Sequence, residues 1–123
     1  MKKDPNSKTP YDLEERSFQF AKGVARFCKN LPRSIANIEY TKQVIRSSGS
    51  VGANYIEANE ALSKKDFSMR IKISRKEAKE SAYWLRLIRE TNSDCYEKEA
   101  ELLHGEAVEL KKIFSAISEK TRT

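Results

Sequence analysis

Apolar and small side chains recur along this sequence at alternating spacings of four and three residues, in four separate stretches. That spacing is typical of helices packed nearly parallel to one another, and no stretch shows the sustained two-residue alternation of a strand. Proline and polar turn sequences separate the stretches, which predicts helices over about 12–31, 35–62, 64–91 and 94–118. Because only a few residues connect them, neighbouring helices must run antiparallel. The pattern therefore predicts an all-α protein, an antiparallel up-down-up-down four-helix bundle over residues 11–120.

The starts of three expected helices carry a recognisable signal. Asp12, Ser63 and Asp94 each stand three residues before an acidic residue, as in the capping box that satisfies the free N–H groups of a first helical turn. Residues 1–10 precede the first of these signals and hold two prolines among polar side chains. We therefore expect a disordered N-terminal tail over 1–10.

The stretch RSSGSVGANYIEANEA, residues 46–61, is rich in glycine and serine for the middle of a helix. It lacks the GxxxxGK[ST] spacing of a phosphate-binding loop, and no strand precedes it. A flexible linker is also disfavoured, because apolar residues keep the helical period straight through the stretch. We interpret it as a helix face made of small residues so that another helix can approach closely. The expected seam of this helix, flanked by Val44, Val51 and Ala58, consists of Thr41, Ile45, Ser48, Gly52, Tyr55, Asn59 and Leu62.

Composition and isolated reactive residues argue against several classes of protein. Hydrophobic residues make up 38% and charged residues 34% of the chain, which indicates a folded protein rather than a disordered one. No apolar run approaches the roughly 20 residues that cross a bilayer, and no signal-peptide core is present, so a cytoplasmic protein without membrane contact is expected. Cys28 and Cys95 lack partners at metal-ligand spacing and are expected to be reduced thiols. His104 is the only histidine, and the acids around it do not form the Glu-x-x-His pairs of a di-iron bundle. We expect no catalytic residue, no metal and no cofactor.

Positive charge is concentrated in one expected helix. Residues 64–89 hold nine Lys and Arg against three acids, a surplus equal to the net charge of +6 of the whole chain. On a wheel of about 100° per residue, most of these cations lie opposite the core and extend over about 30 Å, long enough to follow a nucleic-acid backbone. The candidate nucleic-acid-binding residues are Lys65, Lys72, Arg75, Lys76, Lys79, Arg86 and Arg89, with Arg46 as a weaker candidate. The same row also fits a solvated charged face in which Glu77 and Glu80 supply helical ion pairs.

A second apolar strip lies on the flank of this helix. It consists of Met69, Ile73, Trp84 and Leu87. A single bundle core needs only one apolar stripe, so the second one favours an oligomer interface anchored by Trp84. Additional core packing and a base-stacking role for Trp84 are the alternatives.

Several separated motifs of this sequence resemble a known family. They are RSSGSVGANYIEA at 46–58, Asp66-Phe67, SRKEAKE at 74–80 and Tyr83-Trp84-Leu85. Together they resemble the four helix bundle proteins also called 23S rRNA-intervening-sequence proteins, over nearly the whole chain. The resemblance implies a small bacterial up-down bundle that forms homopentamers and has no enzymatic activity to transfer. The family is also similar to the accessory proteins of diversity-generating retroelements, which are basic pentamers that bind nucleic acid and a reverse transcriptase.

These observations predict a non-catalytic, oligomeric helical bundle that binds nucleic acid through its third helix. RNA is the expected ligand and DNA the second choice. The alternative is a protein–protein scaffold or accessory subunit for a partner such as a polymerase, docking through its basic and acidic faces. A passive product of a mobile insertion is a third interpretation. The pentamer rests on the resemblance alone.

Overall fold

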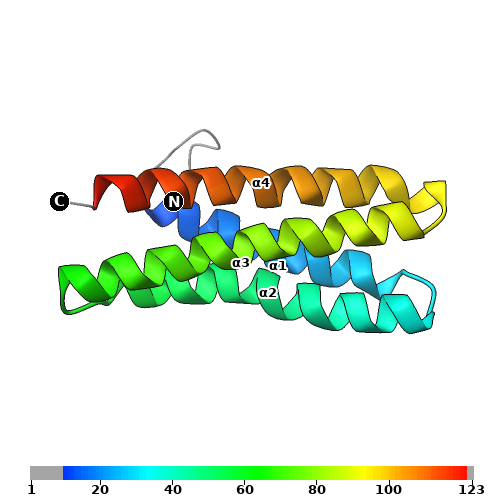
Figure 1. Ribbon diagram of the computed structural model, residues 1–123, viewed down its shortest axis with the longest axis horizontal. Helices are drawn as coiled ribbons and strands as arrows, with labels where there is room; N and C mark the ends of the chain where they lie inside the picture. The colour runs from blue at the N-terminus through cyan, green and yellow to red at the C-terminus, as the bar shows by residue number, and fades with distance from the viewer. Residues whose placement is uncertain (1–9, 122–123) are drawn as a thin grey trace.

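Four long helices run antiparallel along the molecule in the computed structural model, which describes residues 10–121 (Figure 1). The helices are α1 (Pro10–Lys29), α2 (Ile35–Asn59), α3 (Lys64–Thr91) and α4 (Glu97–Lys120), and a short 3₁₀ helix, η1 (Asp94–Tyr96), precedes the last of them. The described residues contain no strand. The predicted all-α, up-down-up-down four-helix bundle is therefore confirmed.

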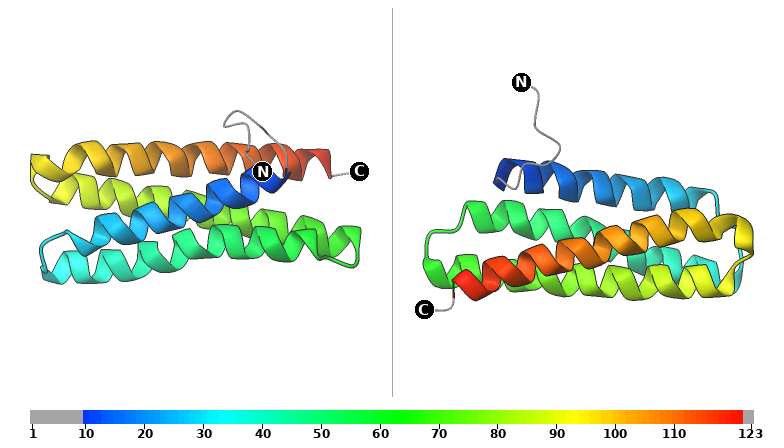
Figure 2. Two further views of the ribbon diagram at one scale, coloured as in Figure 1. Left: turned by 180° about the vertical axis from the view of Figure 1, so that it is seen from behind. Right: turned by 90° about the horizontal axis from the view of Figure 1, so that it is seen from above.

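The four helices do not contact one another equally. Helix α3 packs extensively along both α2 and α4, whereas α1 has a smaller contact with α2 and a still smaller one with α4. The two views in Figure 2 show α1 crossing the others at a visible angle. As a result, α3 has the most extensive helix contacts of the four, on two flanks, and its remaining face points to solvent.

The observed helix ends differ from the expected ones by a few residues. The Ser63 hydroxyl accepts a hydrogen bond from the Asp66 N–H at 3.0 Å, as the capping signal predicts. Ser34 makes the equivalent bond at the start of α2, whereas α1 already begins at Pro10 and η1 has no side-chain cap. The expected tail over 1–10 lies outside the described residues, except for Pro10.

The buried face of α2 is rotated relative to the predicted seam. Val44, Val51 and Ala58, expected at its flank, lie at the centre of the core. Of the predicted seam, Ser48 and Tyr55 are buried as expected. By contrast, Ile45 is 47% exposed, Asn59 is exposed, and Leu62, beyond the end of α2, is fully exposed. The reason is that α2 packs more extensively on α3 than on α1, so its core face turns toward α3.

Small side chains allow the close contacts that the stretch at 46–61 predicts. A Cβ atom built on Gly52 would lie only 3.2 Å from the Ser17 Cβ of α1. On the α3 side, the Ser74 hydroxyl donates a 2.8 Å hydrogen bond to the Val51 carbonyl, and other serines of the two helices also bond across the interface. The stretch is helical up to Asn59, so it is neither a phosphate loop nor a linker.

None of the helices in residues 10–121 combines the length and the apolar character that a membrane span requires.

Candidate nucleic-acid interface

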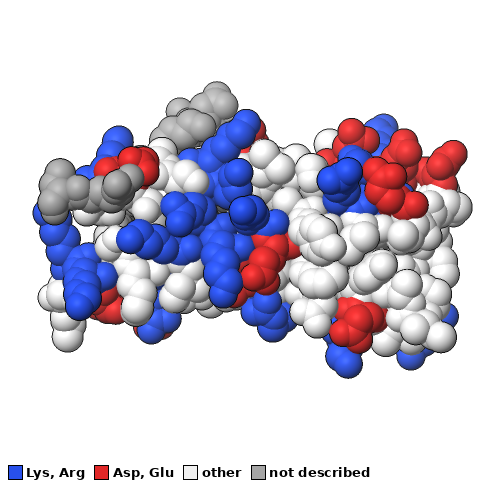
Figure 3. All heavy atoms as spheres, in the orientation of Figure 1, with Lys and Arg blue, Asp and Glu red and all other residues white. Residues whose placement is uncertain are grey.

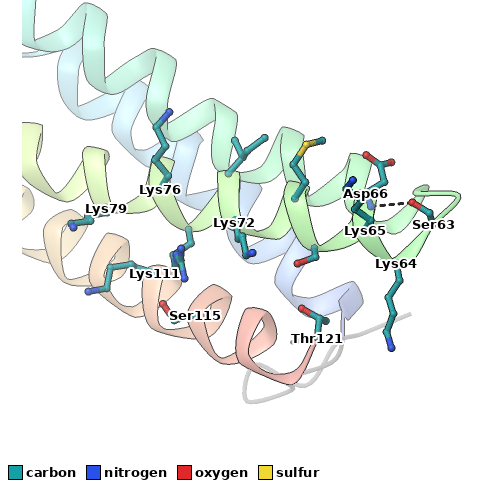
Figure 4. A pocket seen from close by; sticks show the side chains of 14 residues that line it. Ser63, Lys64, Lys65, Asp66, Lys72, Lys76, Lys79, Lys111, Ser115 and Thr121 are labelled. Carbon is teal, nitrogen blue, oxygen red and sulfur yellow. Dashed lines mark hydrogen bonds between the residues drawn. The ribbon is translucent and has the colours of Figure 1, made fainter. Parts of the chain in front are cut away.

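The solvent-facing side of α3 forms an open groove of about 1270 Å³ along its first half, bordered by the end of α4. Helix α3 supplies most of the lining and α4 supplies two residues, Lys111 and Ser115 (Figure 4). The cations that line it are Lys64, Lys65, Lys72, Arg75, Lys76, Lys79 and Lys111. In Figure 4, the side chains of Lys72 and Lys79 extend from α3 toward α4, which carries Lys111, while that of Lys76 extends from the same exposed face toward the opposite flank of α3. We call this feature the basic groove.

The cations of the basic groove are not neutralised within the described chain. Lys65, Lys72, Lys76 and Lys79 are exposed, and none of the seven cations makes an ion pair with another residue of 10–121. Figure 3 shows Lys and Arg gathered over the part of this face where α3 begins and α4 ends. Asp and Glu gather at the opposite end, where α4 begins (Figure 3). This face of the molecule therefore has a lengthwise separation of charge, which concentrates positive potential over the groove.

Among the acids of α3, Asp66 lines the basic groove, whereas Glu77 and Glu80 turn toward α2. Glu77 is buried, and its carboxylate faces the Arg46 guanidinium of α2 at 3.3 Å. Glu80 lies 3.2 Å from the same guanidinium. The sequence-based alternative, in which these two acids pair along α3, is therefore not what the structure shows. Arg46 is committed to two acids and is not a free cation of the groove.

The far end of the predicted basic row has a different environment. Arg89 is 21% exposed and lies 3.1 Å from Glu90 and 3.9 Å from Glu101. Neither Arg86 nor Arg89 lines the basic groove. The structure therefore brings together five of the seven predicted residues, Lys65, Lys72, Arg75, Lys76 and Lys79, and separates the remaining two.

Sequence analysis did not identify Lys111 as part of this surface. It lies on α4, whose sequence is acidic overall, and it joins the groove because the end of α4 packs beside the start of α3. The antiparallel connection of the last two helices was the available signal, since it places the end of one beside the start of the other.

The predicted apolar strip of α3 is divided into two parts. Met69, 48% exposed, and Ile73 border the basic groove. Trp84 is half-buried and its ring lies 6.0 Å from that of Tyr40 on α2. Glu77 and Glu80 occupy the positions between the two parts on the same side of the helix. Trp84 therefore contributes to packing between α2 and α3, while Leu87 is half-buried beyond it.

The remaining candidate residues do not form a reactive site. Burial, followed by the positive charges of Arg89 and Arg86, lowers the pKa of His104 below its ordinary value of 6.5. Cys28 is buried and Cys95 is exposed, and both are free thiols. Over residues 10–121, no three His, Cys, Asp or Glu side chains come together as a metal site would require.

Comparison with known proteins relates this chain to a protein family and to solved structures. The model of the 23S rRNA-intervening sequence protein family matches residues 11–116. A crystal structure from Bacteroides thetaiotaomicron, described as a protein with unknown function from the S23 ribosomal protein family, superimposes with a TM-score of 0.74. It is 28% identical to this chain, and the match covers 86% of this chain and 97% of the other. No protein of curated function matches the sequence.

Proposed function

The chain belongs to the 23S rRNA-intervening sequence protein family, and we propose that its basic groove binds nucleic acid, RNA in particular, without catalysing a reaction. The observation that supports this function most strongly is a set of seven cations around one open groove, none of which forms an ion pair within residues 10–121. If these cations formed only a solvated surface without a ligand, acids would be expected to pair with them, because unpaired like charges repel one another. Here Asp66 lines the groove but makes no ion pair with another residue of 10–121, and Glu77 and Glu80 pair with Arg46 of α2 instead.

The expected interaction is with the phosphate backbone. A row of lysines without a rigid hydrogen-bonding frame suits phosphates better than base edges. Each phosphate that a lysine neutralises releases condensed counterions, so affinity must fall steeply with salt. If five phosphates are contacted on a single strand, the logarithm of the association constant should fall with a slope of about −3.5 against the logarithm of salt concentration.

The test is fluorescence anisotropy of a labelled RNA over a series of salt concentrations. One variant replaces Lys72, Lys79 and Lys111 of the groove by Gln. A matched variant replaces Lys29, Lys42 and Lys98 by Gln. These three lysines are exposed and lie outside the groove, so their replacement removes the same charge from another part of the surface. We expect the groove variant to bind at least about tenfold more weakly and the matched variant to lose much less. Equal losses would contradict a defined interface, and a DNA of the same sequence tests the preference for RNA.

Oligomer formation is a second part of this proposal. Isoleucines on the outer flank of α2 support it: Ile38, Ile45 and Ile56 are 43%, 47% and 47% exposed. Such side chains favour contact with another copy of the chain. Light scattering should show an oligomer, a pentamer by the family resemblance, and Ile45→Lys should shift it toward smaller species. The interface predicted at Met69, Ile73, Trp84 and Leu87 is tested in the same way with Met69→Lys.

The alternative function, a scaffold for a protein such as a polymerase, would use the same charge separation. Nuclease treatment distinguishes the two. A specific protein that remains bound after nuclease digestion, together with no RNA affinity of the pure chain, would favour the scaffold.

A further inference from the structure

One aromatic side chain lies within the exposed basic row of α3. Seven positions of this helix recur at alternating spacings of four and three residues, and all seven are exposed. In order they are Lys65, Met69, Lys72, Lys76, Lys79, Tyr83 and Arg86. Tyr83 is 59% exposed, and it follows Lys79 by one helical turn, about 6 Å along the axis. No acid interrupts this outward row.

The Tyr83 ring is held in place by the residues behind it. Its centroid lies 5.2 Å from that of Trp84, with the two rings at 72° to one another, the favourable edge-to-face arrangement. Trp84 in turn packs on the hydrophobic core and on Tyr40. The tyrosine therefore presents an aromatic surface to solvent while a supported neighbour restrains its movement.

We infer that Tyr83 is a stacking platform for an unpaired base, and that the ligand of the basic groove is single-stranded RNA. This inference rests on the proposed function, since it adds a base contact to the phosphate contacts of the groove. A row of cations that follows the backbone, combined with an aromatic ring that receives a base, is the arrangement that proteins use for single strands. Bases of a duplex are stacked inside it and cannot offer a face to the tyrosine.

Exposed aromatic rings elsewhere lack this combination. Phe18 on α1 is also 59% exposed, but it lies on a different helix from the exposed basic row of α3 and next to the contact between α1 and α2. Phe18→Leu is therefore the matched control for Tyr83→Leu, because both remove an equally exposed ring.

The experiment measures binding of three probes of equal length by anisotropy at low salt. They are a twelve-nucleotide oligouridine RNA, the same backbone carrying abasic residues, and a twelve-base-pair RNA duplex. Tyr83→Leu should weaken oligouridine binding by about five- to a hundredfold, as expected for one stacked base. Tyr83→Phe should restore binding because it keeps the ring, and Phe18→Leu should have no such effect. The abasic strand should bind the wild-type protein more weakly than oligouridine does.

Tryptophan emission gives an independent readout. Trp84 is the only tryptophan and touches Tyr83, so a base stacked on Tyr83 should change its emission. Oligouridine should produce this change and the abasic strand should not.

The outcomes separate the inference from the proposed function. If oligouridine and the abasic strand bind equally well, or Tyr83→Leu affects neither, the stacking platform is excluded while salt-dependent phosphate binding stands. If Tyr83→Leu changes only the oligomeric state, the ring belongs to a protein contact and the inference is overturned. If none of the three probes binds at low salt, the proposed function fails, and the inference fails with it.

Discussion

Gly52 of α2 and Ser17 of α1 lie so close that a Cβ atom on the glycine would stand 3.2 Å from the serine Cβ. Gly49, three residues earlier on the same helix, has no neighbouring atom within 4 Å of the equivalent position. The two glycines of the same motif therefore have different roles: one permits a helix contact and the other faces open space.

Substitution by alanine should distinguish these two glycines. Gly49→Ala should raise the free energy of unfolding by about 0.5–1 kcal/mol, because alanine favours the helix and meets no neighbour. Gly52→Ala should gain less or lose stability, since Ser17 must move to accommodate the methyl group. Urea denaturation followed by circular dichroism measures both, and equal gains would contradict the close contact.

Removal of Arg46 should destabilise the bundle through the acid that it leaves behind. The side chain of Glu77 is only 8% exposed, whereas that of Glu80 is 39% exposed. Arg46→Met should therefore cost about 1–3 kcal/mol, the penalty for an unsatisfied buried polar group. Glu80→Gln should cost less than about 0.5 kcal/mol, as exposed pairs do. Adding Glu77→Gln to Arg46→Met should recover part of the loss, and simple additivity of the two changes would argue against their coupling.

The two cysteines should differ in reactivity. Burial raises the pKa of the Cys28 thiol to about 11, so this thiol stays protonated at pH 8 as well as shielded from reagents. Cys95 is exposed and should react alone with Ellman's reagent in the native protein. Unfolding in guanidinium chloride should expose Cys28 and so make a second thiol reactive. Rapid labelling that persists in Cys95→Ser would show that Cys28 is accessible.

His104 should make the folded protein less stable in mildly acidic solution. Its pKa is lowered in the folded state, so the unfolded chain takes up a proton more readily as the pH falls below 6.5. Stability contributed by the neutral imidazole is complete above that pH and is lost as the pH falls toward the folded-state pKa. Because His104 is the only histidine, NMR can follow its titration directly. Arg86→Gln and Arg89→Gln should each raise the measured pKa, and unchanged values would contradict their influence.

Much of the candidate site could be predicted from one helix. A surplus of lysine and arginine at helical spacing places Lys65, Lys72, Lys76 and Lys79 on one outward face, because the period of a helix determines which side chains share a side. The same helical spacing also places Arg86 on this face, and Arg86 is exposed as well. It cannot say which of these cations have acidic neighbours on other helices.

Contacts between helices account for the remainder of the site. Arg46 belongs to α2, and its pairing with Glu77 and Glu80 removes it from the candidate cations. Those two acids are then not available to the lysines of α3, which form no ion pair within residues 10–121. Lys111 joins them from α4. Neither relationship follows the period of a single helix, since each depends on the rotation of one helix against another.

The sequence by itself determined that this protein is an antiparallel four-helix bundle with its positive charge on the third helix. Apolar spacing and short connections are local properties, and they suffice for that conclusion. The tertiary structure decided which face of α2 enters the core, as the exposure of Ile45 and the burial of Val44 illustrate. It also decided that Trp84 supports the ring of Tyr83, one helical turn beyond the last α3 lysine of the basic groove. Both outcomes depend on how closely helices approach, which is set by packing among residues far apart in the chain.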